Sequence, residues 1–492
     1  MALASTPSSF DSTHKTERDT ERQSALPIRT ADVLAGLAGR RVAELELTHG
    51  NGDLIKILEV LGIGGSFKVT SPWELDDNGL HLINAGGYAA LPFGESHPDL
   101  VGFVHEYLEK NKTMSLPQQA VSQWRAALET NLVALLSREA PSHHDSQVFF
   151  SNSGAEAVEA ALKFAKAARP KAPIIINFTK GYHGKTFGAL SLTPNDEYQA
   201  PFRPLMAHVH TLPYGDADAF EAALQRLGTK NICAVVLEPI QGEGGVIIPP
   251  ADFLPRVGEL CQRHGILSIA DEIQSGLGRT GHWFASLALG LEPDIITLAK
   301  PLGGGLVATG ATICRKWIMK KMLGGLESKR HSNTFGGNSL AMAVGLKSLE
   351  LIAEQNLVEK ARVNGERGLA RLRDIQAAHP GYIREVRGAG MLFALQLRHV
   401  IKPALVGGNK ELAAQFGTGL AMRTLHQNGV HVCFTLNSAQ TVRLTPALNM
   451  PDEIFDELFE RVARVAEANK QAWQMLPKTP PKVILELAKM AL

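Results

Sequence analysis

Cysteine is scarce in this sequence, with four in 492 residues, and aromatic residues make up only 6% of it. The cysteines lie far apart and lack the spacing of metal ligands, so we expect free thiols in a reducing compartment. They are Cys233, Cys261, Cys314 and Cys433. No apolar run approaches the length of a membrane span. Fifty basic residues face 49 acidic ones, so charge indicates neither nucleic acid nor an anionic membrane as a partner.

The first 30 residues lack the apolar core of a signal peptide. They contain acidic residues, which argues against a transit peptide. They are rich in Ser, Thr, Arg and Glu, which predicts a disordered extension. We therefore expect a cytoplasmic protein. The chain as a whole has the composition of a soluble globular enzyme, with 45% hydrophobic residues, and is long enough for two domains.

From about residue 100, short apolar runs alternate with helical segments, the pattern of a mostly parallel sheet with crossover helices. Helices are predicted over 31–60, 155–168, 340–354, 357–377 and 452–474, a hairpin over 66–84 with its turn at 76–79, and strands over 148–150, 174–178, 383–397, 430–435 and 441–445. The elements after residue 346 are typical of a smaller α+β unit. A proline-rich stretch at 477–481 sets off a short amphipathic tail.

Three apolar runs in this middle region each stop at a charged residue: 232–237 at Glu238, 266–270 at Asp271, and 294–299 at Lys300. Runs this short and this apolar predict strands that are buried on both faces. In open α/β sheets, ligands bind beyond the carboxyl ends of such strands. Glycines follow Lys300 and allow a bulky group to approach the backbone. The three charges together therefore predict one site.

Ser153, Gly154 and Ala155 join a predicted strand to a helix, where free N–H groups and the helix dipole favour a phosphate. Pyridoxal 5′-phosphate (PLP) needs such a phosphate site. It also needs a lysine for its aldehyde and a carboxylate that keeps its ring nitrogen protonated. A nicotinamide cofactor needs neither the lysine nor the acid, and its glycine fingerprint is absent after the first strands. The residues therefore predict PLP as the cofactor.

A series of short motifs supports this prediction. They lie at 151–156, 181–186, 238–245, 271–276, 298–305, 333–338 and 442–446. In order and spacing they resemble the class III PLP-dependent aminotransferases, which include ornithine, acetylornithine, 4-aminobutyrate and putrescine aminotransferases. The resemblance runs from about residue 84 to 448, which is most of the chain.

The resemblance implies an α/β fold, the PLP-dependent transferase fold type I, with a large domain around a mostly parallel sheet and a smaller α+β domain. The expected parts are an extension (1–30), an N-terminal segment packing with the small domain (31–99), the large domain (100–345), the small domain (346–475) and a tail (476–492). It also implies a homodimer with shared active sites, or a tetramer.

The resemblance assigns roles at the cofactor. Lys300 holds the cofactor and moves the proton, and Asp271 pairs with the ring nitrogen. Ser153, Gly154 and Ala155 are implied to contact the phosphate, and Thr334 the phosphate of the partner subunit's cofactor. Tyr182 stacks on the ring and Gln274 lies near the ring hydroxyl. Glu238 and His183 support these residues. For His183 a purely structural role is the alternative.

Four further residues bear on the substrate. By resemblance, Arg443 grips a substrate carboxylate, and Glu243 shields this arginine while the amino donor is bound. Lys185 stands where ornithine-type and acetylornithine-type members carry an arginine for the donor's α-carboxylate. Putrescine aminotransferases resemble this chain at that position. Tyr88 falls where the family places an aromatic residue at the entrance.

We therefore predict transfer of a terminal amino group from a diamine or ω-amino compound, such as putrescine or ornithine, to 2-oxoglutarate or pyruvate by a ping-pong mechanism. The alternatives are an acetylornithine, ornithine or 4-aminobutyrate aminotransferase and an amino-acid racemase of the same family. A catalytically idle structural relative is a further alternative, which the Lys300 and Asp271 pair argues against.

Overall fold

The computed structural model describes residues 27–37, 39–116, 120–406 and 408–490. The extension predicted for residues 1–30 lies almost entirely outside this part of the chain. Residues up to Glu59 and residues from Val60 onward form two compact units, which are described separately. The finer division into domains that the sequence suggested stays a prediction.

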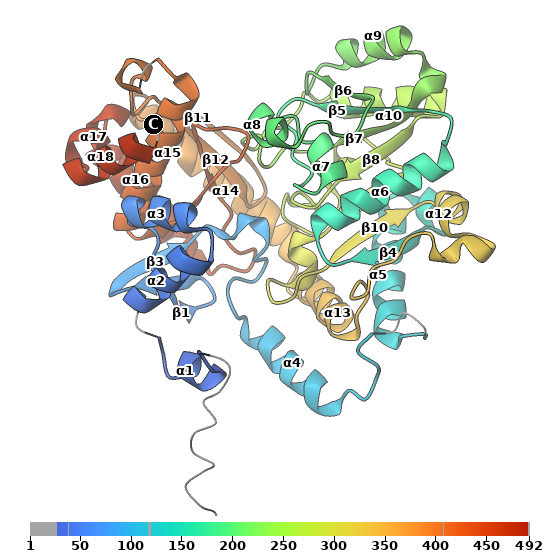
Figure 1. The fold of residues 1–492 in the computed structure, drawn as a ribbon, viewed down its shortest axis with the longest axis horizontal. Coiled ribbons are helices and arrows are strands. Elements are labelled where there is room, and N and C mark those ends of the chain that lie inside the picture. Colours follow the sequence, from blue (N-terminus) through green and yellow to red (C-terminus); the bar gives the residue numbers. More distant parts are fainter. Residues whose placement is uncertain (1–26, 38, 117–119, 407, 491–492) are drawn as a thin grey trace, which may run out of the picture. The chain divides into compact units, whose positions relative to one another are not determined.

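The first unit is helical, as the sequence predicted. It contains α1 (Thr30–Leu34), α2 (Gly39–His49) and most of α3 (Gly52–Leu61) (Figure 1). Apolar residues recur in α3 at helical spacing, but only Leu61 at its end is buried. The single helical region predicted for 31–60 is therefore three short helices.

A seven-stranded sheet forms the centre of the second unit, in the order β4-β10-β9-β8-β7-β5-β6. The strands are β4 (Gln147–Ser151), β5 (Ile174–Phe178), β6 (Val209–Leu212), β7 (Ile232–Leu237), β8 (Leu267–Asp271), β9 (Ile295–Leu298) and β10 (Gly310–Cys314). The pairs β6-β5, β5-β7, β7-β8 and β8-β9 are parallel, whereas β10 runs antiparallel to β9 and β4. The predicted, mostly parallel sheet is confirmed.

Helices cover both faces of this sheet (Figure 1). On one face lie α6 (Gly154–Ala168) and α12 (Lys316–Leu323), and on the other α9 (Ala217–Leu227) and α10 (Phe253–His264). Every residue of β7 is buried: Val236 packs under α6, while Val235 and Leu237 pack under α9 and α10. Burial on both faces explains why these strands are continuously apolar.

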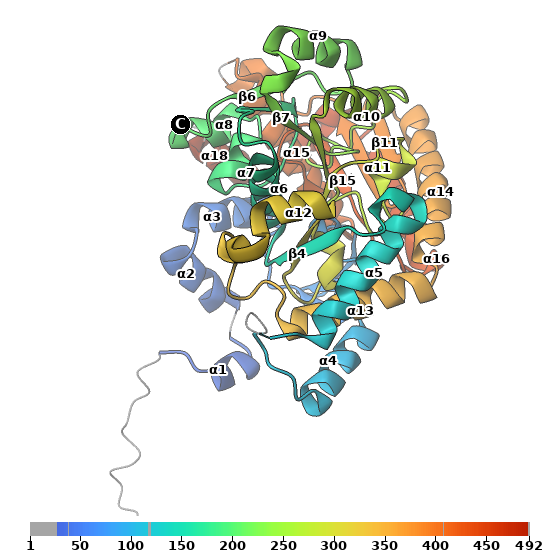
Figure 2. The same cartoon turned by 90° about the vertical axis from the view of Figure 1, so that its right-hand side faces the viewer.

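The remaining helices of this region are α4 (Pro98–Lys110), α5 (Gln123–Glu139), α7 (Phe187–Ser191), α8 (Asp196–Gln199) and α11 (Ala285–Ala288). The long helix α13 (Ser339–Glu354) packs against α4 and α5, as Figure 2 shows. Asn338 precedes its first residue, and the Asn338 side chain accepts a hydrogen bond from the backbone N–H of Ala341 and so caps the helix.

A second, four-stranded antiparallel sheet follows, in the order β11-β12-β15-β14. Its strands are β11 (Ile383–Ala389), β12 (Leu392–Leu397), β14 (Cys433–Phe434) and β15 (Thr441–Leu444), and its helices are α14 (Leu357–Ala378), α15 (Lys410–Gln427) and α16 (Asp452–Ala468). The strand predicted over 383–397 is in fact a hairpin, because Gly390 turns the backbone with φ 51°. The helix predicted to reach 474 ends at Ala468.

The chain ends in the short helices α17 (Met475–Lys478) and α18 (Pro481–Met490). The predicted proline-rich stretch falls where these two helices meet. No helix among the described residues is both long and apolar enough to cross a membrane. All four cysteines are buried free thiols, as predicted.

Residues 66–84 form three strands rather than a two-stranded hairpin: β1 (Lys68–Ser71), β2 (Glu74–Asp77) and β3 (Leu80–Asn84). The predicted turn at 76–79 is confirmed, with positive φ at Asn78 and Gly79. β3 pairs with β13 (Val430–His431). This pairing holds the chain that continues to Tyr88 beside the second sheet, since Ala85 N–H donates to the carbonyl of His431.

Candidate active site

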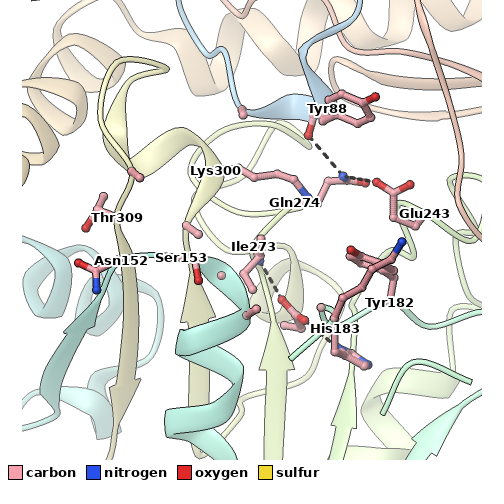
Figure 3. A pocket seen from close by; sticks show the side chains of 18 of the residues that line it. Tyr88, Asn152, Ser153, Tyr182, His183, Glu243, Ile273, Gln274, Lys300 and Thr309 are labelled. Carbon is pink, nitrogen blue, oxygen red and sulfur yellow. Dashed lines mark hydrogen bonds and ion pairs between the residues drawn. The ribbon is translucent and has the colours of Figure 1, made fainter. Parts of the chain in front are cut away.

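A cavity of about 750 Å³ opens at the carboxyl ends of β7, β8 and β9 (Figure 3). The predicted residues that line it are Tyr88, Ser153, Gly154, Ala155, Tyr182, His183, Lys185, Glu238, Glu243, Asp271, Gln274 and Lys300. The three charged strand ends therefore meet in one place. Arg443 and Thr334 do not line the cavity.

Asp271 is fixed at the end of β8 by three hydrogen bonds. Its Oδ1 accepts from Thr297 Oγ1 at 3.1 Å and from the Ile273 N–H at 3.2 Å, and its Oδ2 lies 2.6 Å from His183 Nδ1. Burial lowers the pKa of His183, but the Asp271 hydrogen bond and charge outweigh it, and the net shift is upward. These hydrogen bonds hold the Asp271 carboxylate in one orientation at the end of β8, where a protonated pyridine nitrogen needs an acceptor.

His183 is almost fully buried, at 2% exposure. Its Nε2 has no hydrogen-bond partner among the described residues, whereas its backbone N–H donates to Thr193 Oγ1 at 3.0 Å. Its ring lines the cavity, and the hydrogen bond that the ring makes goes to Asp271.

Lys300 lies two residues after the end of β9, where the chain turns through a short 3₁₀ helix at Lys300–Gly303. Burial lowers the pKa of its amine, and the Arg443 charge adds to this shift, while Glu243 and Asp271 oppose it. The lowered pKa makes the neutral, nucleophilic amine more accessible near neutral pH.

The N-terminus of α6 opens onto the same cavity. Ser153 caps the helix by accepting from the Glu156 N–H at 3.2 Å, yet its side chain stays exposed. At Gly154, a Cβ would lie 2.9 Å from Ile273, so only glycine fits without a shift. The free N–H groups of this first turn form an anion site. Asn152 and Thr309 also line the cavity here and were not singled out: Asn152 lies within the motif 151–156, whereas Thr309 lies outside every motif.

Glu238 binds two backbone segments at once. Its Oε1 accepts from the Tyr182 N–H at 2.8 Å and its Oε2 from the Gly242 N–H at 2.9 Å. Burial raises the pKa of Glu238 to about 7. Both oxygens are thus used to hold Tyr182 and the turn that carries Glu243 against the cavity.

Arg443 lies on β15 with no exposed surface. Its Nη1 is 2.6 Å from Glu243 Oε1 and 3.0 Å from Gln274 Oε1. Burial raises the pKa of Glu243, but the charges of Arg443 and Lys300 lower it by more, so the carboxylate stays ionised. The Nε and Nη2 of Arg443 lack partners among the described residues. Glu243 and Gln274 thus separate a buried guanidinium from the cavity.

Tyr88 lies next to both Gln274 and Arg443. It has the left-handed backbone φ of 52°, and its carbonyl accepts from Gln274 Nε2 at 3.4 Å, so that Gln274 lies between Tyr88 and Glu243 (Figure 3). The Arg443 guanidinium lies 5.5 Å from the Tyr88 ring centroid. Burial raises the pKa of Tyr88 to about 12, so the phenol stays neutral.

Lys185 lies at the rim, with its Nζ 4.0 Å from the ring centroid of Tyr198. The Tyr198 hydroxyl donates to the carbonyl of Leu436 at 3.2 Å, which fixes the ring beneath the lysine. Tyr198 was missed in the sequence because it stands in the four-residue helix α8, outside any motif. Thr334 is exposed and lies outside the cavity of its own chain.

This fold and site define a PLP-dependent enzyme of fold type I. The sequence matches the model of the family Aminotransferase class-III over residues 71–466, and the chain therefore belongs to that family and is a PLP-dependent aminotransferase. The predicted family, fold class and cofactor are confirmed.

Solved structures agree with this assignment. The chain is similar to an ornithine aminotransferase from Toxoplasma gondii ME49, with 26% identity, a TM-score of 0.75, and coverage of 89% of this chain and 97% of that one. A PLP-bound amine transaminase from an uncultivated Pseudomonas species is 26% identical, with a TM-score of 0.71 and coverage of 82% and 94%. A transaminase from the marine bacterium Virgibacillus is 25% identical, with a TM-score of 0.75 and coverage of 88% and 99%.

The residues of the cavity fit PLP. A phosphate fits the exposed N-terminus of α6, the ring nitrogen fits the fixed carboxylate of Asp271, and the aldehyde fits the Lys300 amine. When bound, PLP withdraws electrons from the carbon that carries the substrate's amino group. Among the described residues, no group of His, Cys, Asp and Glu side chains is arranged to hold a metal.

Proposed function

We propose that this enzyme transfers a terminal amino group from a diamine or ω-amino compound to 2-oxoglutarate or pyruvate by a ping-pong mechanism. The observation that carries the proposal is that Arg443 is shielded from the cavity. Its guanidinium is fully buried and paired with Glu243 at 2.6 Å, so a donor that enters the cavity meets no free arginine. A donor end without a carboxylate suits that arrangement.

Lys185 supports the same donor class. Its ammonium lies on the Tyr198 ring, a contact that offers a donor carboxylate no bidentate partner. Half-exposed Tyr88 adds an aromatic wall that suits a methylene chain.

Each named side chain has a defined task in the proposed reaction. Lys300 Nζ would take the proton from the amine-bearing carbon and pass it to the former aldehyde carbon of the cofactor, and it would move a proton the opposite way in the second half-reaction. Asp271 keeps the proton on the ring nitrogen. When a dicarboxylic acceptor arrives, one of its carboxylates takes the place of Glu243 on Arg443.

A second candidate donor is ornithine, because two similar solved structures are ornithine aminotransferases from Toxoplasma gondii and Plasmodium falciparum. Acetylornithine and 4-aminobutyrate are also candidate donors, and an amino-acid racemase reaction is a candidate activity. A spectrophotometric screen of amines against 2-oxoglutarate and pyruvate tests the proposal. Formation of keto product from diamines supports it, whereas loss of optical rotation without keto product indicates a racemase.

We also propose that the enzyme is a homodimer, or a pair of such dimers, with shared active sites in the cytoplasm. Thr334 is exposed beside Phe335, which is 59% exposed, and Leu306 of the cavity rim is 38% exposed. Burial of these apolar side chains against a second copy would bring Thr334 to the partner's cavity. Sedimentation analysis of the holoenzyme tests this; a monomer with full activity would contradict it.

A further inference from the structure

A second cavity, of about 510 Å³, adjoins the turn that carries Glu243. It shares no lining residue with the active-site cavity within the described part of the chain. Its walls come from the loop before Gly181, from helix α14, from strands β11 and β12, and from the segment between β14 and β15. Elements that are far apart in sequence thus line one cavity.

Positive charge collects in this cavity. Lys180, Arg373 and Arg387 line it together with one carboxylate, Glu385, so three cations and one anion leave a formal charge of +2. Arg387 is engaged, with its Nη1 2.8 Å from Glu385 Oε2 and 3.2 Å from Gln396 Oε1. The side chains of Lys180 and Arg373 have no hydrogen-bond or ion-pair partner among the described residues. Both side chains are solvent-exposed, and because they line one cavity they can bind the two charges of one dianion.

Apolar side chains also line the cavity and form its apolar wall. They are Ile247, Ile248, Leu369 and Val386, and Ser438 adds a hydroxyl that is hydrogen-bonded to Thr441. We propose that the cavity binds a small organic dianion with a short apolar body, either a dicarboxylate or a phosphate ester. The cations bind its charge, and the apolar wall excludes water from its carbon chain.

The cavity contacts the turn of Glu243 directly. Arg387 Nε donates to the Gly245 carbonyl at 2.9 Å, and the Gly245 N–H donates to the Gly242 carbonyl within the same turn. Ser438 follows Asn437, whose N–H donates to the Glu243 carbonyl at 3.0 Å. An anion that draws Arg387 away from Gly245 loosens the hold on Glu243. The proposed link between this cavity and Glu243 rests on the proposed function, because it concerns the shielding of Arg443.

Binding is tested on the holoenzyme by calorimetric titration with inorganic phosphate and with succinate, at constant ionic strength in chloride. Arg373→Ala should weaken binding about fivefold, and Lys180→Ala/Arg373→Ala about tenfold or more. Arg371→Ala is the matched control, since it removes one charge from the same helix but lies outside the cavity, near Asp456. It should leave the affinity within about twofold of the wild type.

Binding of only one probe identifies which kind of dianion the cavity takes. Equal affinities in the wild type and all variants, or no binding of either probe, would overturn the site. Succinate that binds at Arg443 in the active site does not mimic the result, because that binding persists in Arg373→Ala.

The link to Glu243 has its own readout. Phosphate should slow the amine half-reaction of the wild type by about twofold or more at saturation, and Arg373→Ala should need about fivefold more phosphate for half of this effect. The same dependence on phosphate concentration in both proteins, or no slowing in either, would overturn the link, even where the binding site itself is established. If the proposed function itself is wrong, the enzyme will not turn over diamines even when neither phosphate nor succinate is present. This result differs from a loss of the link.

Discussion

Arg443 Nη1 lies 2.6 Å from Glu243 Oε1, in a place where the guanidinium has no exposed surface. Breaking a buried pair by removing one partner typically costs about 3–5 kcal/mol, because the remaining charge is left without a partner. Arg443 therefore needs an anion in both half-reactions. In the proposed reaction, Glu243 supplies it while the amine is bound, and the carboxylate of the acceptor supplies it afterwards.

This exchange predicts opposite defects in two variants. Arg443→Ala should impair the 2-oxoglutarate half-reaction far more than the amine half-reaction, because it removes the partner of the acceptor carboxylate. Glu243→Ala should weaken the amine half-reaction and favour donors that carry a carboxylate. Stopped-flow absorbance measures each half-reaction separately.

Glu243→Gln is the matched control for this pair, since it keeps the shape of the side chain but not its charge. It should resemble Glu243→Ala if the charge matters and the wild type if only the shape matters. Equal losses in both half-reactions for Arg443→Ala and Glu243→Ala would mean that no such exchange takes place.

Asp271→Asn should lower kcat by several orders of magnitude with the fold intact. A neutral amide cannot hold the proton on the ring nitrogen, and a thousandfold loss corresponds to roughly 4 kcal/mol of transition-state stabilisation. Thr297→Val removes only one hydrogen bond to Asp271 and should cost far less. Steady-state kinetics and circular dichroism check both variants; near-normal activity of Asp271→Asn would refute the proposed geometry.

Lys300 should carry the covalent link to the cofactor. Borohydride reduction of the holoenzyme followed by peptide mapping should find the pyridoxyl group on Lys300, and Lys300→Ala should bind PLP without turnover. Lys185 is the second lysine that lines the cavity, so Lys185→Ala, still labelled at Lys300, is the control. A label on any other lysine would show the central assignment to be wrong.

Lys185→Arg should raise kcat/KM for ornithine relative to putrescine or cadaverine. A guanidinium offers two parallel donors to an α-carboxylate, which the ammonium on the Tyr198 ring does not. Tyr198→Phe keeps the ring but not the hydroxyl bond to Leu436, and it should leave the donor preference nearly unchanged. An unchanged ratio in Lys185→Arg would remove Lys185 from the account of specificity.

Uptake of PLP by the apoenzyme should depend on pH through Lys300. Burial, and then the Arg443 charge, lower the pKa of its amine, while Glu243 opposes the shift. Only the neutral amine attacks the cofactor, so uptake should speed up as pH rises, with a midpoint below the value of about 10.4 of a free lysine side chain. Glu243→Gln removes an anion that raises this pKa and should move the midpoint to lower pH.

Glu385→Gln, which lies outside the cavity that holds Lys300, is the control for charge alone and should leave that midpoint in place. Absorbance during reconstitution over a range of pH gives the midpoints. A midpoint that rises in Glu243→Gln would contradict the electrostatics.

The sequence predicted the convergence of Glu238, Asp271 and Lys300 because parallel strands end at one edge of a sheet, and each run is apolar to its last residue. It did not predict the link between His183 and Asp271. That contact joins the loop after β5 to the end of β8, and no local pattern specifies which loop side chain reaches a given carboxylate.

The smaller elements were harder to predict for a similar reason. The hairpin at Gly390 looked like one strand because its short turn has no polar run, and β1 was not separated from β2. Asn437 was not singled out either, although it bonds to Gly181, Asn195 and Glu243. Its partners come from distant parts of the chain, so tertiary packing rather than local sequence gives it a place in the site.

The most direct test of the proposed function is kcat/KM of the wild-type enzyme for putrescine, cadaverine, ornithine, acetylornithine and 4-aminobutyrate, each with 2-oxoglutarate and with pyruvate. The closed Glu243–Arg443 pair and the lysine at position 185 predict that the diamines are the best donors. A preference of about a hundredfold for ornithine or acetylornithine, equivalent to about 2.7 kcal/mol in the transition state, would contradict the diamine reaction.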